Sequence, residues 1–220
     1  MYTIGELYDL THTAAAGYLA GFTYPHEALP GIKALILELG SRLSAEEYDH
    51  PADDVWIAKD AVLFPNHYIA GPAIIGHRTE VRPGAFIRGS ALVGDDCVIG
   101  NSTELKNVIL FDRVQVPHYN YVGDSILGYH SHMGAGAITS NVKGDQKPVV
   151  LRDGTRTLDT GMKKVGAMLG DYAEIGCNSV LNPGTVVGRN TQIYPLSMVR
   201  GTVPADSIFK NGSEIVPKRI

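Results

Sequence analysis

A repeat of six residues constrains this chain more than any other feature. Aliphatic residues recur at every sixth position without a break, at Ile57, Leu63, Ile69, Ile75, Val81, Ile87, Val93, Ile99 and Leu105. Neither the 3.6-residue period of a helix nor the two-residue period of a strand explains this register. A second column, four residues after each aliphatic from Ile57 to Ile99, is small in every case except His67. Three such segments for each turn of chain predict a solenoid with a triangular cross-section.

The predicted fold is all-β, a left-handed parallel β-helix of hexapeptide repeats. The aliphatic column fills its interior, and neighbouring coils pair as parallel strands about 4.8 Å apart. The register slips by one residue between Leu105 and Leu110 and again between Val122 and Leu127. Such slips re-aim side chains, as β-bulges do.

The segments outside the repeat define the predicted domain organisation. Residues 1–50 form an N-terminal helical cap, because residues 31–43 show helical spacing at Ile32, Leu35 and Ile36. We expect this helix to cover the open N-terminal end of the β-helix, an edge that needs protection. Residues 51–205 form the β-helix, with a loop inserted at residues 148–168, and residues 206–220 form a C-terminal tail.

Charge and cysteine content limit the classes of partner. The net charge is -4, from 19 Lys and Arg against 23 Asp and Glu. The chain therefore lacks the broad cationic surface that binds nucleic acid or anionic lipid. No signal peptide or membrane span is evident, which predicts a cytoplasmic protein. Cys97 and Cys177 lie far apart without CxxC spacing, so we expect neither a disulfide nor a bound metal.

Two cations are predicted to stand side by side. Arg88 directly follows Ile87, and Lys106 directly follows Leu105, 18 residues later. One coil has 18 residues, so the two side chains should stack on one face about 5 Å apart. Like charges this close are favoured where an anion such as phosphate lies over them. The alternative is a solvated pair that splays apart.

His118, in the segment VPHYNYVGD, is the candidate general base. Imidazole accepts a proton near neutral pH, and the hydroxyl of Tyr121, three residues further on, could orient it or a substrate. A surface histidine without a catalytic role is the alternative.

Two further histidines give a different interpretation. His130 and His132 are two residues apart, and with His118 or a residue of a neighbouring coil they could hold zinc. This arrangement would suit a zinc-dependent, carbonic-anhydrase-like β-helix protein. The acids that usually orient such ligands are not evident in the sequence.

A series of motifs resembles a known family. The segments RPGAFIRG, TELKN, VPHYNYVGDSILG and MGAGAITSN occur in order, and the one-residue slip after the lysine strand is also a family feature. Together they resemble the C-terminal acetyltransferase domain of the bifunctional enzyme that makes UDP-N-acetylglucosamine. They are also similar to the C-terminal domains of archaeal sugar-phosphate nucleotidyltransferases. The N-terminal nucleotidyltransferase domain has no counterpart in this sequence, so we expect no nucleotidyl transfer from it.

The resemblance implies a reaction. Members of that family transfer acetyl from acetyl-CoA to the amine of an amino-sugar 1-phosphate, here glucosamine 1-phosphate or galactosamine 1-phosphate, at clefts between the subunits of a homotrimer. By motif, His118 is the base. The implied substrate-binding residues are Arg88 or Arg82, Lys106, Tyr121, His132, Asn141 and Lys147, and the implied acetyl-CoA residues are Ala135, Cys177 and Pro195.

Some positions leave the assignment open. Arg82 lies in the RPG tripeptide of the family, whereas Arg88 has the one-coil distance to Lys106, and we favour Arg88. His132 stands where the family has Asn, and Cys177 where it has Ser. A non-catalytic sugar-nucleotide-binding or oligomerising module is a further alternative to the acetyltransferase.

Overall fold

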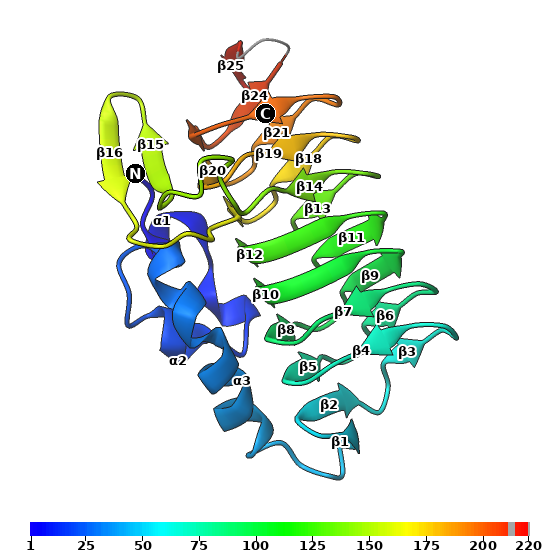
Figure 1. Cartoon of the computed structure of the whole chain (residues 1–220). Helices are drawn as coiled ribbons and strands as arrows, with labels where there is room; N and C mark the ends of the chain where they lie inside the picture. Colours follow the sequence, from blue (N-terminus) through cyan, green and yellow to red (C-terminus); the bar gives the residue numbers. More distant parts are fainter. Residues whose placement is uncertain (211–213, 220) are drawn as a thin grey trace.

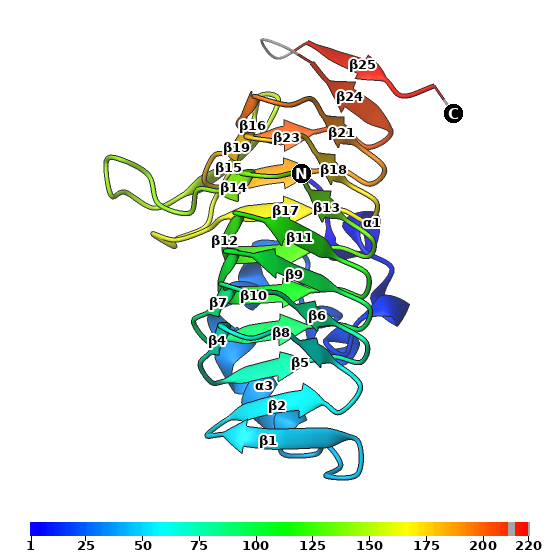
Figure 2. The same ribbon diagram turned by 90° about the vertical axis from the view of Figure 1, so that its right-hand side faces the viewer.

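The computed structural model describes residues 1–210 and 214–219. From Val55 onward the chain winds as a solenoid of short parallel strands, with the N-terminal helices beside it (Figures 1 and 2). The predicted left-handed parallel β-helix is confirmed.

Each coil contributes strands to three faces, which we number in chain order. Face 1 contains β2 (Val55–Ala58), β5 (Ala73–Ile75), β8 (Ala91–Val93), β17 (Ala167–Leu169), β20 (Thr185–Val187) and β23 (Thr202–Val203). Face 2 contains β3 (Val62–Leu63), β6 (Glu80–Val81), β9 (Val98–Asn101), β11 (Gln115–His118), β13 (His132–Met133), β18 (Glu174–Ile175), β21 (Gln192–Ile193) and β24 (Ser207–Phe209). Face 3 contains β4 (Tyr68–Ile69), β7 (Phe86–Ile87), β14 (Ile138–Thr139), β19 (Val180–Leu181) and β22 (Met198–Val199).

Two long strands, β10 (Glu104–Leu110) and β12 (Tyr121–Leu127), run from face 3 onto face 1. We call the turn between these faces the 3–1 corner and the turn between faces 2 and 3 the 2–3 corner. The long strands bend at Asn107 and Asp124, whose φ angles are 54° and 48°. Asn and Asp tolerate this left-handed region better than most residues. The two bends are the places where the sequence register slips.

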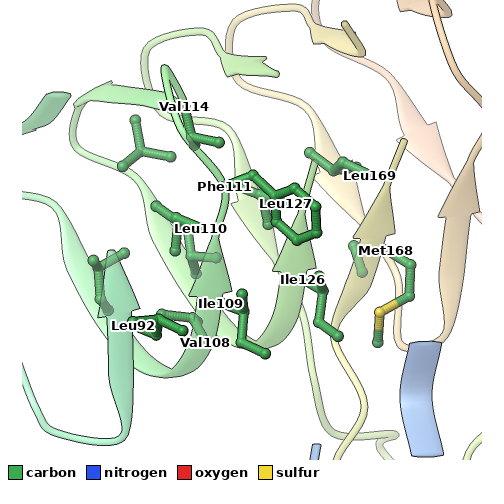
Figure 3. Close-up of a cluster of buried hydrophobic side chains, with 14 of the residues drawn as sticks. Leu92, Val108, Ile109, Leu110, Phe111, Val114, Ile126, Leu127, Met168 and Leu169 are labelled. Carbon is green, nitrogen blue, oxygen red and sulfur yellow. The ribbon is translucent and has the colours of Figure 1, made fainter. Parts of the chain in front are cut away.

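Face 1 is buried on both of its sides. Leu110 and Leu127 are in register and point into the solenoid, whereas Ile109 and Ile126, one residue earlier, point outward and are also fully buried (Figure 3). The outward column is apolar along the face: Ile74, Leu92, Ile109, Ile126, Met168 and Val186. Burying each such side chain contributes about 1.5–3 kcal/mol.

The N-terminal segment covers this outward column. It contains α1 (Ile4–Leu7), η1 (Leu10–His12), α2 (Ala16–Leu19), η2 (Pro25–Gly31) and α3 (Ile32–Gly40). The buried side of α3 includes Ile32, Leu35 and Ile36, and the helix contacts β5, β8 and β10. The helix therefore lies along face 1 and not over the open end, where the sequence analysis placed it. At that end β1 (Tyr48–Ala52) pairs antiparallel with β2.

The insertion replaces one 3–1 corner. Within the predicted loop, β15 (Val150–Asp153) and β16 (Arg156–Asp159) form an antiparallel hairpin, and Ala167 already belongs to face 1. Val149 and Leu151 are buried against the solenoid. The segment is thus a docked hairpin with loops on either side.

The C-terminal residues continue the solenoid. β24 pairs parallel with β21, and β25 (Ile215–Pro217) pairs antiparallel with β24. The predicted tail thus includes a strand of face 2, while residues 211–213 and 220 lie outside the described residues. In the part of the chain that the structure describes, no helix is long and apolar enough to cross a bilayer.

Candidate functional site

The 2–3 corner places the predicted base and the predicted acetyl-CoA residues in one column. Successive coils present His118, Ala135, Cys177 and Pro195 there, and backbone hydrogen bonds of 2.8–3.0 Å join each coil to the next. Because coils repeat about every 4.8 Å, the column extends over about 14 Å. The fold brings these four residues to one corner, which their spacing in the sequence does not show directly.

The His118 side chain is exposed and makes no hydrogen bond within the described residues. Its backbone, in contrast, is fixed, because the His118 N–H donates to Asn120 Oδ1 at 3.1 Å. The Asn120 amide is 2% exposed and donates to the carbonyls of Gly134 and Ala137 at 2.9 and 3.0 Å. A buried amide thus ties the His118 coil to the coil of Ala135, while the imidazole stays open to a ligand.

Arg88 and Lys106 lie in register at the far end of face 3, because Ile87 pairs with Leu105. The predicted one-coil spacing is therefore present. Arg88 donates to Glu104 Oε1 at 2.7 Å, and this hydrogen bond raises the pKa of the guanidinium. Lys106 is half-buried and pairs with no carboxylate among the described residues. Lys106 is thus the cation of the pair that is open to an anion.

A polar network lies beside Lys106 at the 3–1 corner. The carboxylate of Asp124, 5% exposed, accepts from Asn107 Nδ2 at 2.9 Å and from Asn141 Nδ2 at 2.6 Å. Asn141 also donates to the Tyr121 hydroxyl at 3.2 Å. Burial raises the pKa of Tyr121, so its hydroxyl stays neutral and can donate a proton in a hydrogen bond.

Gly123 keeps this part of face 3 open. It stands between Lys106 and Ser140 in the ladder, and a Cβ there would lie 2.5 Å from the Tyr121 hydroxyl. A larger residue would displace the tyrosine and fill the space beside Lys106.

Three predicted residues lie elsewhere. Arg82 is on face 2 and binds Glu80 at 2.9 Å, and His132 is also on face 2, with Nδ1 2.8 Å from Glu174 Oε2. Lys147 is an exposed residue of the insertion. The single chain does not bring these three residues to the Lys106 end of face 3.

The three histidines of the zinc interpretation are also apart. His118 is at the 2–3 corner, His132 is on face 2, and His130 stacks on Tyr172 with ring centroids 5.5 Å apart. Within residues 1–210 and 214–219, no group of three or more His, Cys, Asp or Glu could hold a metal ion.

The sequence analysis missed Glu104, Asn107 and Asp124. Glu104 had a usable signal, because it lies two residues before Lys106 and alternate residues of a strand share a side. The other two depend on the bend at the 3–1 corner, which no periodicity indicates.

Comparisons with known proteins agree with this architecture. Residues 69–156 match the family described as GMPPB C-terminal domain. The chain is 29% identical over 206 residues to the bifunctional protein GlmU of Methanococcus maripaludis, covering 92% of this chain and 50% of the relative. The chain resembles the C-terminal domain of GlmU-type proteins. The resemblance inferred from the motifs is thereby confirmed.

A second relative is named for two activities. The bifunctional sugar-1-phosphate nucleotidylyltransferase/acetyltransferase of Sulfurisphaera tokodaii is 31% identical over 156 residues, covering 71% of this chain and 39% of the relative. The chain spans about half the length, or less, of the curated relatives that it matches.

Solved structures give weaker similarities. The acetyltransferase domain of PglB from Neisseria gonorrhoeae is 16% identical with a TM-score of 0.33, covering 74% of this chain and 57% of that chain. GDP-perosamine N-acetyltransferase from Caulobacter crescentus is 14% identical with a TM-score of 0.33, covering 74% and 56%. The sequence relatives, and not these structures, define the resemblance.

Proposed function

We propose that this chain transfers acetyl from acetyl-CoA to the amine of an amino-sugar 1-phosphate, glucosamine 1-phosphate or galactosamine 1-phosphate, in cytoplasmic nucleotide-sugar biosynthesis. One observation carries the proposal: face 3 is bordered by His118 and the predicted acetyl-CoA column at one corner and, near the other, by Lys106, which pairs with no carboxylate of residues 1–210 and 214–219. The name of the S. tokodaii relative, which includes a sugar-1-phosphate acetyltransferase activity, supports the same reaction class.

Face 3 provides polar contacts for such a substrate. Tyr121 and Gly123 are two strand residues, about 7 Å, apart, so Tyr121 and the position of Lys106 lie on the same side of one face. Lys106, in register with Gly123, would bind the phosphate, with Arg88 beside it. Asn141 and the neutral Tyr121 hydroxyl would bind the sugar. These contacts accelerate the reaction mainly by holding the amine at the thioester.

His118 would act as the general base. The amine nitrogen attacks the thioester carbonyl, the N–C bond forms, the C–S bond breaks, and CoA leaves as a thiolate. The imidazole accepts the proton that the amine loses and can pass it to the departing sulfur. Direct attack requires no covalent enzyme intermediate.

The backbone of Ala135 would stabilise the developing oxyanion. The N–H groups of Gly134 and Gly136 are engaged by Ile175 O and His118 O, at 2.7 and 3.0 Å. The Ala135 N–H has no acceptor within the described residues and lies one coil from His118. A preorganised donor at this place is worth most where charge develops in the transition state.

The proposal includes a homotrimer in which face 3 meets a neighbouring subunit. Tyr68, Phe86 and Met198 lie on face 3 and are 60%, 41% and 70% exposed. Tyr68 and Phe86 are neighbours in the ladder, and Met198 lies five coils further along the same face. Exposed apolar side chains distributed along one face are typical of an interface. Sedimentation of the full chain should give three times the monomer mass, and a monomer at assay concentration would contradict this part of the proposal.

The test is thiol release from acetyl-CoA with glucosamine 1-phosphate and with galactosamine 1-phosphate. His118→Ala should lower kcat by about 10²- to 10⁴-fold, the usual contribution of a general base. His50→Ala is the matched control, because His50 is an exposed imidazole on β1, far from face 3. Its rate should equal that of the wild type.

The other outcomes separate the alternatives. Absence of turnover with both sugars, together with binding of UDP-N-acetylglucosamine, would favour the non-catalytic module. Equal rates for His118→Ala and the wild type would reject His118 as the base. Stoichiometric zinc in the purified protein, together with no thiol release from acetyl-CoA, would favour the zinc-dependent, carbonic-anhydrase-like alternative.

A further inference from the structure

The insertion encloses a pocket that the proposed reaction does not use. Its volume is about 470 Å³, within the range of small-molecule sites. The solenoid contributes Ser140, Asn182 and Arg200 from the 3–1 corner, and the insertion contributes Lys143 and Arg152. Two parts of the chain that are distant in sequence thus line one space.

The hairpin holds the Arg152 backbone against the solenoid. Leu151 is 2% exposed and packs over Gly184, so Arg152, next along the strand, points to the other side. The Arg152 carbonyl accepts from Thr202 Oγ1 at 2.8 Å, and a Cβ on Gly201 would lie 3.2 Å from that carbonyl. The backbones that carry Arg152 and Arg200 therefore touch, because Arg200 directly precedes Gly201.

The pocket carries an excess of positive charge. Within the described residues neither Arg152 nor Arg200 pairs with a carboxylate, and Lys143 lies 3.3 Å from Asp145. Three cations and one carboxylate thus line the same space. Like charges held together repel one another, and a bound anion offsets this repulsion. Arg156, on the same hairpin but outside the pocket, instead has an ion pair with Asp153.

The pocket is separate from the anion site at Lys106. Lys106, Gly123, Ser140, Asn182 and Arg200 follow one another in the ladder of face 3. Four coil spacings of about 4.8 Å separate Lys106 from Arg200, or about 19 Å. One phosphate cannot contact both.

We propose that this pocket is a second anion site, which binds a small molecule through a phosphate or diphosphate group. The guanidinium groups of Arg152 and Arg200 provide planar, forked donors that match phosphate oxygens, and Lys143 adds a point charge. The Asn182 and Ser140 side chains lie beside them as polar contacts. The site includes neither His118 nor Lys106, so the proposal stands whether or not His118 is catalytic.

The test is calorimetric titration of the full chain with inorganic pyrophosphate at low ionic strength. Arg152→Gln and Arg200→Gln should each weaken binding by about 10-fold or more, since hydrogen bonds to charged groups contribute about 1.5–3 kcal/mol. Arg156→Gln is the matched control and should bind as the wild type does. Arg200→Gln changes an exposed side chain of the solenoid, so the test remains valid if Arg152→Gln disturbs the hairpin.

A further variant separates this site from the proposed active site. Lys106→Gln should still bind pyrophosphate in the pocket, whereas binding there should be weakened in Arg152→Gln. Absence of pyrophosphate binding would overturn the proposal, and so would equal affinities of the wild type, Arg152→Gln and Arg200→Gln. Pyrophosphate binding that disappears only in Lys106→Gln would assign the anion to the site at Lys106. That result would also overturn the proposal. None of these outcomes depends on acetyl transfer.

Discussion

At the 2–3 corner each coil turns in the same way, and backbone hydrogen bonds of 2.8–3.0 Å join the coils. The exposed His118 side chain has no hydrogen-bond partner in the described part of the chain. At the 3–1 corner β10 and β12 bend inside continuous strands, the buried carboxylate of Asp124 holds two amides, and the insertion replaces a turn. Regular stacking of the coils does not depend on residue type, so residues proposed for catalysis can occupy this corner. The irregular corner instead depends on particular side chains.

This difference predicts unequal responses to the same change of residue. Asp124 and Asn178 both have positive φ angles, 48° and 55°, so alanine at either position pays about 1 kcal/mol of backbone strain. Asp124→Ala also removes the close acceptor of both amides, leaving Asn107 Nδ2 with Leu29 O at 3.4 Å and Asn141 Nδ2 with the Tyr121 hydroxyl at 3.2 Å. We expect Asp124→Ala to lower the free energy of unfolding by about 3 kcal/mol, and Asn178→Ala by about 1 kcal/mol. Urea unfolding with an unchanged m-value measures both. Equal losses would mean that the two corners do not differ.

The docking of the insertion at the 3–1 corner gives a second, smaller effect. Gly184 has φ +77°, and a Cβ there would lie 2.8 Å from Val149 Cγ1 and 2.9 Å from Leu151 Cδ2. Gly184→Ala should therefore cost about 2 kcal/mol from strain and overpacking. Gly154→Ala at the hairpin turn is the control, because φ is +59° and nothing lies within 4 Å. Gly154→Ala should lower the free energy of unfolding only by the backbone strain, about 1 kcal/mol, in the same urea titration. A Gly184→Ala loss no larger than that of Gly154→Ala would show that the hairpin is not held at this corner.

The sequence predicted what the repeat controls. The six-residue period predicted the solenoid, and the 18-residue spacing predicted that Arg88 and Lys106 stand one coil apart, which the register shows. The helical spacing predicted α3 but not its position. A usable signal was present, because outward residues of a solenoid face are polar unless something covers them. The outward Ile74, Leu92 and Ile109 therefore indicated a covered face.

The parts that the sequence did not predict are those that depend on local backbone shape. The Asp124 network forms because positive φ at the bends turns side chains from different coils toward one another. The two-residue turn Gly154–Thr155 has glycine in its first position, a common hairpin-turn pattern, so the hairpin was within reach of sequence reasoning. The pocket between Arg152 and Arg200 was not, because it needs the hairpin, the corner and their contact at Thr202 together.

The smallest predicted effect concerns which arginine supports Lys106 on face 3. Lys106→Gln should raise KM for the amino-sugar 1-phosphate about 10-fold, since a half-exposed charged hydrogen bond contributes about 1.4 kcal/mol. Arg88→Gln should raise KM less than this, because Glu104 already holds Arg88 at 2.7 Å. Arg82→Gln should leave KM unchanged, because Arg82 lies on face 2 with Glu80. Steady-state kinetics with saturating acetyl-CoA measures all three variants. If KM rises in Arg82→Gln and stays constant in Arg88→Gln, the phosphate is bound at face 2, and the assignment of the substrate to face 3 fails.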